Sequence, residues 1–95
     1  MKTYILTAQI STNNPKAIKL ALKQLVPKAS IRSTDEGFLV KAAMRGETAK
    51  DLNRNLLSAL RRVERKTVLR AEWRSGGKTE RFFDYVPKAS KINPK

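Results

Sequence analysis

The sequence predicts an α+β fold of the ferredoxin-like class, a β-α-β-β-α-β sheet with two helices on one face plus a C-terminal β-hairpin extension. Three observations lead to this prediction. Several stretches alternate apolar and polar residues, which is typical of half-buried strands. Two other stretches carry apolar residues at helical spacing. The length of 95 residues suits one domain.

A strand followed by a helix is predicted at the start of the chain. Residues 3–10 alternate apolar and polar side chains, which indicates a strand. Either asparagine at 13–14 can cap a helix, and Pro15 suits its first position. Apolar residues then recur at helical spacing. We expect this helix to end near Val26, because Pro27 cannot continue it.

A β-hairpin and a second helix come next. Residues 30–44 hold two strand-like stretches around a turn that contains Asp35 and Gly37, and these residue types favour turns. Thr48 then has an aspartate three residues later, which resembles a capping box. A helical stripe of apolar residues follows it. The second helix is therefore predicted to run from Thr48 to about Arg65.

A second hairpin is predicted near the C-terminus. Residues 67–74 and 79–86 alternate as strands do, and the glycines at 76–77 favour a type I′ turn between them. Residues 87–95 are polar, basic and interrupted by prolines, which predicts a flexible tail. We therefore expect one α+β domain over residues 1–86.

The composition favours a polyanionic partner and disfavours most enzyme classes. Lys and Arg number 21 and Asp and Glu number 8, so the formal net charge is +13. The chain has no Cys and no His, and therefore no thiolate nucleophile, no imidazole base and no usual zinc ligands. Its acidic residues form no acid/base pair. We predict a protein that is not an enzyme and needs no metal or cofactor, and we expect it to be cytoplasmic because no apolar stretch is long enough to span a bilayer.

Two groups of side chains are predicted to contact nucleic acid. The first forms a basic ridge along one side of the second helix without acidic partners: Lys50, Arg54, Arg61 and Arg65. The second lies on the last hairpin, where arginines next to aromatic rings suit phosphates and stacked bases: Arg70, Arg74, Lys78, Arg81, Phe83 and Tyr85. The alternatives are a solvated helix face, aromatic rings packed on a strand or a dimer partner, and neutralisation of Arg81 by Glu72.

Four segments also resemble a known family. They are the strand end at 10–12, the Gln-Leu-Val-Pro helix end at 24–27, the Asp-Glu-Gly turn at 35–37 and the second-helix segment at 51–61. Over residues 4–68 the chain is similar to the small, non-catalytic dimerising subunit of the KEOPS complex, which helps to make threonylcarbamoyl-adenosine in tRNA. The C-terminal hairpin and the high basicity depart from that family.

The resemblance implies a subunit without an active site that pairs through its sheet and docks its helices on a catalytic subunit. Leu57 and its neighbours would then face protein. Residues 40–46, with the helix and the basic hairpin after them, are also similar to Alba-type nucleic-acid-binding proteins. The extra strand expected at 30–33 departs from the Alba pattern.

We therefore expect a non-catalytic RNA-binding accessory protein, a small subunit of a KEOPS-like tRNA-modification complex. RNA, with tRNA as one candidate, is favoured over DNA as the partner. A catalytic subunit and a homodimer or heterodimer partner are further expectations, and no membrane partner is expected. Three alternatives stay open: an Alba-like DNA- or RNA-binding chromatin protein, a ribosome-associated structural protein, and a protein-only interaction subunit. A steep salt dependence of nucleic-acid affinity separates the RNA-binding protein from the protein-only subunit.

Overall fold

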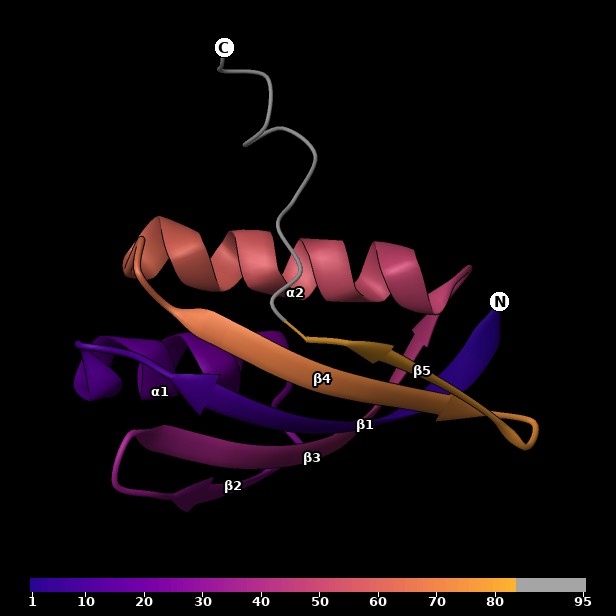
Figure 1. Cartoon of the computed structure of the whole chain (residues 1–95), viewed down its shortest axis with the longest axis horizontal. Helices are drawn as coiled ribbons and strands as arrows, with labels where there is room; N and C mark the ends of the chain where they lie inside the picture. The colour runs from indigo at the N-terminus through magenta and orange to yellow at the C-terminus, as the bar shows by residue number, and fades with distance from the viewer. Residues whose placement is uncertain (84–95) are drawn as a thin grey trace, which may run out of the picture.

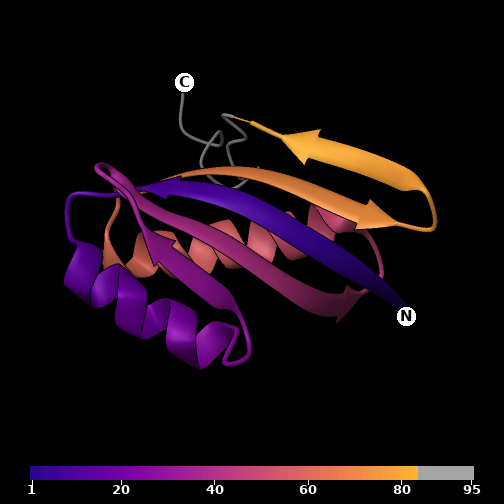
Figure 2. The same ribbon diagram turned by 90° about the horizontal axis from the view of Figure 1, so that it is seen from below.

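The fold is a five-stranded antiparallel sheet with two helices on one of its faces (Figures 1 and 2). A computed structural model of the chain describes residues 1–83. In chain order the elements are β1 (Lys2–Ser11), α1 (Pro15–Leu25), β2 (Ser30–Ser33), β3 (Gly37–Gly46), α2 (Ala49–Val63), β4 (Val68–Ser75) and β5 (Lys78–Phe82). The predicted α+β class, with its antiparallel sheet and two helices, is confirmed.

The strands lie in the order β2-β3-β1-β4-β5, and all neighbours are antiparallel. Helix α1 connects β1 to β2, and β3 lies between these two strands. Helix α2 connects β3 to β4, and β1 lies between them. This order differs from that of a four-stranded ferredoxin-like sheet, because β5 continues the sheet beyond β4.

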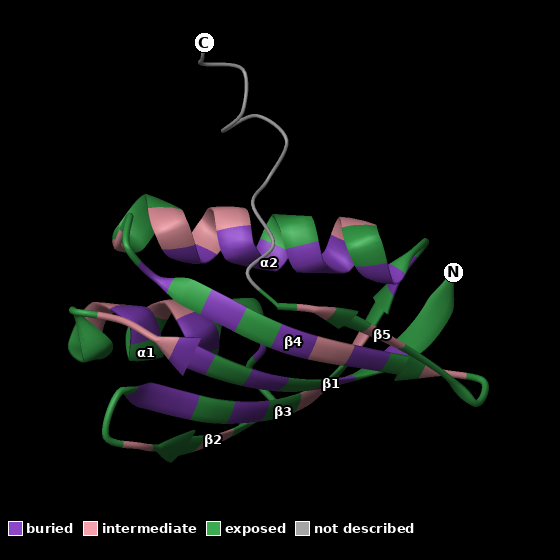
Figure 3. Cartoon of the chain, in the orientation of Figure 1, coloured by how far each residue is buried: buried purple, intermediate pink, exposed green. Residues whose placement is uncertain are grey.

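The core forms between the sheet and the helices. Alternate residues of β1 are buried, from Tyr4 to Ile10, and the residues between them are exposed. The same alternation along β4 buries Leu69, Ala71 and Trp73 (Figure 3). Each fully buried large side chain contributes on the order of 2 kcal/mol through removal of apolar area from water. The core lies on the helix-covered face of the sheet, and no helix or strand among residues 1–83 covers the opposite face.

The structure corrects the predicted end of the second helix. The predicted end of the last strand lies partly beyond the described residues. Helix α2 ends at Val63 rather than near Arg65, because Glu64 adopts an extended conformation with its N–H still bonded to the carbonyl of Leu60. Strand β5 ends at Phe82, whereas the predicted strand continued to residue 86, and residues 84–86 lie outside the described residues. The predicted tail at 87–95 lies outside them as well. Neither described helix has the length and apolar composition of a membrane-spanning segment.

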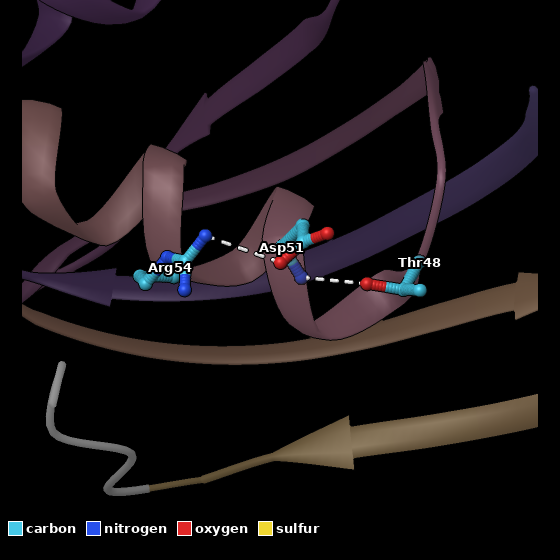
Figure 4. A network of polar contacts seen from close by, with 3 residues as sticks. All are labelled: Thr48, Asp51 and Arg54. Atoms are coloured by element: carbon cyan, nitrogen blue, oxygen red, sulfur yellow. Dashed lines mark hydrogen bonds and ion pairs between the residues drawn. The ribbon is translucent and has the colours of Figure 1, made fainter.

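Helix α2 begins at a side-chain cap that the sequence predicts. The Thr48 hydroxyl accepts a hydrogen bond of 3.0 Å from the backbone N–H of Asp51 (Figure 4). We expect Thr48→Ala to lower the free energy of unfolding by about 1 kcal/mol, because this N–H loses its acceptor. Denaturant unfolding followed by Trp73 fluorescence measures the loss.

The cap of the other helix provides the control. The Asn14 side chain accepts a bond from the N–H of Ala17 that is 3.4 Å long, near the limit for a hydrogen bond. Asn14→Ala should therefore cost less than Thr48→Ala. A larger loss for Asn14→Ala would contradict the ranking of the two caps by their bond lengths.

Candidate nucleic-acid interface

The sheet face that points away from the helices is basic. Strand alternation places six exposed basic side chains on it: Arg32, Lys41, Arg45, Arg70, Arg74 and Arg81. They come from β2, β3, β4 and β5. Glu72 is the one carboxylate that the described strands add to the same face. We call this surface the open face, and a polyanion laid across it meets an excess of positive charge.

The strand register places these side chains in rows across the sheet. Arg32 pairs with Leu39, Leu39 with Gln9, and Gln9 with Arg70, so one row crosses four strands. Neighbouring strands lie about 4.8 Å apart, so the two arginines at its ends are about 14 Å from one another. The positive charge is thus spread over the face, and several phosphates of an extended chain can be contacted at once.

An aromatic ring lies at the end of this row. Phe83 is 48% exposed, and the guanidinium carbon of Arg70 is 5.4 Å from the centre of its ring. Beside them is a hollow of about 260 Å³ that Gln9, Leu39 and Glu72 also line. Arginine and an exposed ring are the groups on which nucleic-acid bases stack. The open face therefore combines charges with a place for a flat, apolar group.

Arg81 of the open face has an acidic partner among the described residues. Arg81 Nε lies 3.0 Å from a carboxylate oxygen of Glu72, and the two side chains are 63% and 40% exposed. The alternative in which Glu72 neutralises Arg81 is thereby confirmed. An exposed pair of this kind contributes only about 0–1 kcal/mol, so a phosphate can compete for the arginine.

The predicted ridge on α2 belongs to the other layer of the molecule. Arg54 is 3.1 Å from a carboxylate oxygen of Asp51, so the prediction that the ridge has no acidic partner is wrong at this position (Figure 4). Arg61 donates from Nε to the carbonyl oxygen of Thr67 and thereby joins the end of α2 to the start of β4. Arg65 follows the helix end, and Lys50 is exposed near the helix start.

The ten predicted residues therefore do not share one surface. Arg70, Arg74, Arg81 and Phe83 are brought together on or beside the open face, whereas the four residues of the α2 group lie with the helical layer. Lys78 pairs with Ser75 next to the glycine turn. Tyr85 lies outside the described residues.

Sequence reasoning missed three basic residues of the open face, Arg32, Lys41 and Arg45. A signal for Lys41 and Arg45 was present, since both alternate with the inward residues Val40, Ala42 and Met44. Leu57 corrects another expectation, because it is only 1% exposed and packs in the core instead of facing a protein partner.

The described residues contain no cluster of His, Cys, Asp and Glu side chains arranged for a metal ion. Comparison of the chain with protein-family models, with curated proteins and with solved structures finds no match. The candidate interface is accordingly defined by the charge, exposure and register of its own residues.

Proposed function

We propose that this chain is a non-catalytic RNA-binding protein that holds single-stranded RNA on its open face. The observation that carries the proposal is the set of six exposed basic side chains on a sheet face that neither helix covers, among which the described strands place a single carboxylate. Each phosphate that such a side chain contacts releases condensed counterions, which favours binding.

The apolar residues of the open face favour a single strand over a duplex. Ile5, Leu39 and Phe83 are between 41% and 48% exposed and lie among the charges. In a duplex the bases are stacked inside and only edges and phosphates reach a flat surface, whereas a single strand can turn its bases onto apolar and aromatic side chains. The exposed apolar residues therefore favour a single strand over a duplex as the form of RNA that the open face binds.

We infer further that the first four strands follow the ferredoxin-like arrangement, since α1 and α2 each connect two strands that have one strand between them. The accessory role in a tRNA-modification complex, which the KEOPS resemblance implies, stays a prediction. The burial of Leu57 argues that any protein partner contacts a surface other than the one this resemblance implies.

A salt titration tests RNA binding. The affinity for a fluorescently labelled single-stranded RNA of mixed sequence is measured by anisotropy over a range of salt concentrations. Six phosphate contacts predict a slope of about −4 for the logarithm of affinity against the logarithm of salt concentration, at about 0.7 per contact for single strands. Unlabelled single-stranded DNA, duplex RNA and tRNA are the competitors.

Polyglutamate is the control for an acidic protein partner. It should compete far less well than RNA if bases and phosphates are both recognised. A flat salt slope, or equal competition by polyglutamate, would contradict RNA binding by the open face and favour the protein-only subunit.

A further inference from the structure

Among the described residues, no strand pairs with the outer edge of β3 over half of its length. Strand β2 pairs only with residues 38–41 of β3, whereas β3 continues to Gly46. Over residues 42–46 the described part of the chain pairs with β3 on the β1 side alone. Backbone N–H and C=O groups of alternate residues therefore point outward without a strand to receive them, and such an edge is a template for an added strand.

An apolar groove lies beside this edge. Its volume is about 520 Å³, and it is lined by residues 25–29 on one side and residues 42–45 of β3 on the other. It exists because α1 ends at Leu25 and the chain comes alongside β3 as a strand only at Ser30. The groove includes the side chains of Leu25, which is 42% exposed, and Met44.

Two cations also line the groove. Lys28 and Arg45 are exposed on opposite sides of it, and no carboxylate is among the lining residues. A second copy of this chain paired here would place these cations near their own counterparts, between two molecules that each carry a formal charge of +13. An acidic occupant instead gains attraction from both.

We propose that this edge and groove bind an extended, acidic segment of a partner protein, which adds a strand to β3. The backbone of the segment pairs with β3 over residues 42–46, an apolar side chain enters the groove, and carboxylates meet Lys28 and Arg45. The proposal shares Arg45 with the open face but otherwise uses the sheet edge and the groove, so it does not require RNA binding.

The probe is a labelled octapeptide that alternates leucine with aspartate, added to the full chain and followed by fluorescence anisotropy. We expect it to bind, and we expect the same peptide with alternate backbone amides N-methylated to bind at least about tenfold more weakly, because methylation removes the donors for strand pairing. A peptide with lysine in place of aspartate should also bind weakly. These comparisons need no variant of the protein.

Leu25→Asp and Leu20→Asp form the matched pair of variants. Both residues are exposed on α1, but Leu20, at 65% exposed, does not line the groove. Leu25→Asp should weaken peptide binding by at least about tenfold, because it places a carboxylate in the apolar groove. Leu20→Asp should leave the affinity within about twofold, although it changes the net charge by the same amount. Circular dichroism checks that both variants fold.

Three outcomes would overturn the proposal. The first is equal binding of the N-methylated or the lysine peptide. The second is loss of peptide binding on reversing Arg32, Lys41 and Arg74 together with unchanged binding by Leu25→Asp, which would place the peptide on the open face. The third is a dimer in sedimentation that Leu25→Asp dissociates, which would assign the groove to a second copy. RNA binding is measured separately, so its failure leaves the peptide result unchanged.

Discussion

Replacing Arg32, Lys41 and Arg74 together by glutamate is expected to weaken binding of single-stranded RNA about a hundredfold at low salt. The three side chains are exposed, come from three strands of the open face and lie outside the core, so the fold should be unaffected. Three lost phosphate contacts at about 1 kcal/mol each give this factor, and they should reduce the magnitude of the salt slope by about 2.

The matched control reverses three basic residues of the helical layer, Lys50, Arg62 and Arg65, which are also exposed. Each reversal changes the charge by two, so both triple variants go from +13 to +7. The control should keep its RNA affinity within about threefold of the parent protein and retain the parent salt slope. Equal losses in the two variants would indicate that net charge, rather than the open face, governs binding.

The register of the last hairpin could be predicted from local sequence. Gly76 and Gly77 both have positive φ, 58° and 80°, as a type I′ turn requires. A two-residue turn fixes which residues lie opposite one another, and Arg74 accordingly pairs with Thr79 and Glu72 with Arg81. Turn chemistry and strand alternation act over a few residues, so they can be recognised in a single sequence.

Neither the residue at which α2 ends nor the set of basic residues that share the open face could be predicted in this way. The sequence has no glycine or proline near Val63 to mark the helix end. The hydrogen bond from Arg61 to the carbonyl of Thr67 joins the helix end to the start of β4, and it forms only once the chain has folded back after the helix. Likewise, Arg32 joins Arg70 in one row only because β3 and β1 lie between their strands. Helical periodicity identifies the outward side of α2 but does not show that this side and the open face belong to different layers.

The periodicity of apolar residues also did not predict a hydrogen bond between two buried polar groups. Trp73 and Asn53 are both fully buried, and the indole N–H of Trp73 donates to the amide oxygen of Asn53 at 3.0 Å. The amide nitrogen of Asn53 has no hydrogen-bond partner among the described residues. Among the described residues Trp73 is the largest fully buried side chain, and its indole N–H is the partner of the Asn53 amide oxygen alone.

Trp73→Ala is accordingly expected to lower the free energy of unfolding by more than about 4 kcal/mol. Truncation of a buried aromatic residue costs about 3–5 kcal/mol, and the unpaired Asn53 oxygen adds about 1–3 kcal/mol. A domain of this size is stable by on the order of 5–15 kcal/mol, so the variant should lose a large part of its stability. Chemical denaturation followed by far-UV circular dichroism measures the loss, because the variant lacks the one tryptophan of the chain.

A double-mutant cycle separates the packing contribution from the hydrogen bond. Trp73→Phe keeps most of the ring but leaves Asn53 with neither polar group paired, and Asn53→Leu leaves the buried indole N–H without an acceptor. Each single variant should therefore lose about 2 kcal/mol. The double variant N53L/W73F buries no unpaired polar group, so it should be more stable than the sum of the two single losses predicts. Strictly additive losses would mean that packing alone, without the bond between indole and amide, explains the effect of truncating Trp73.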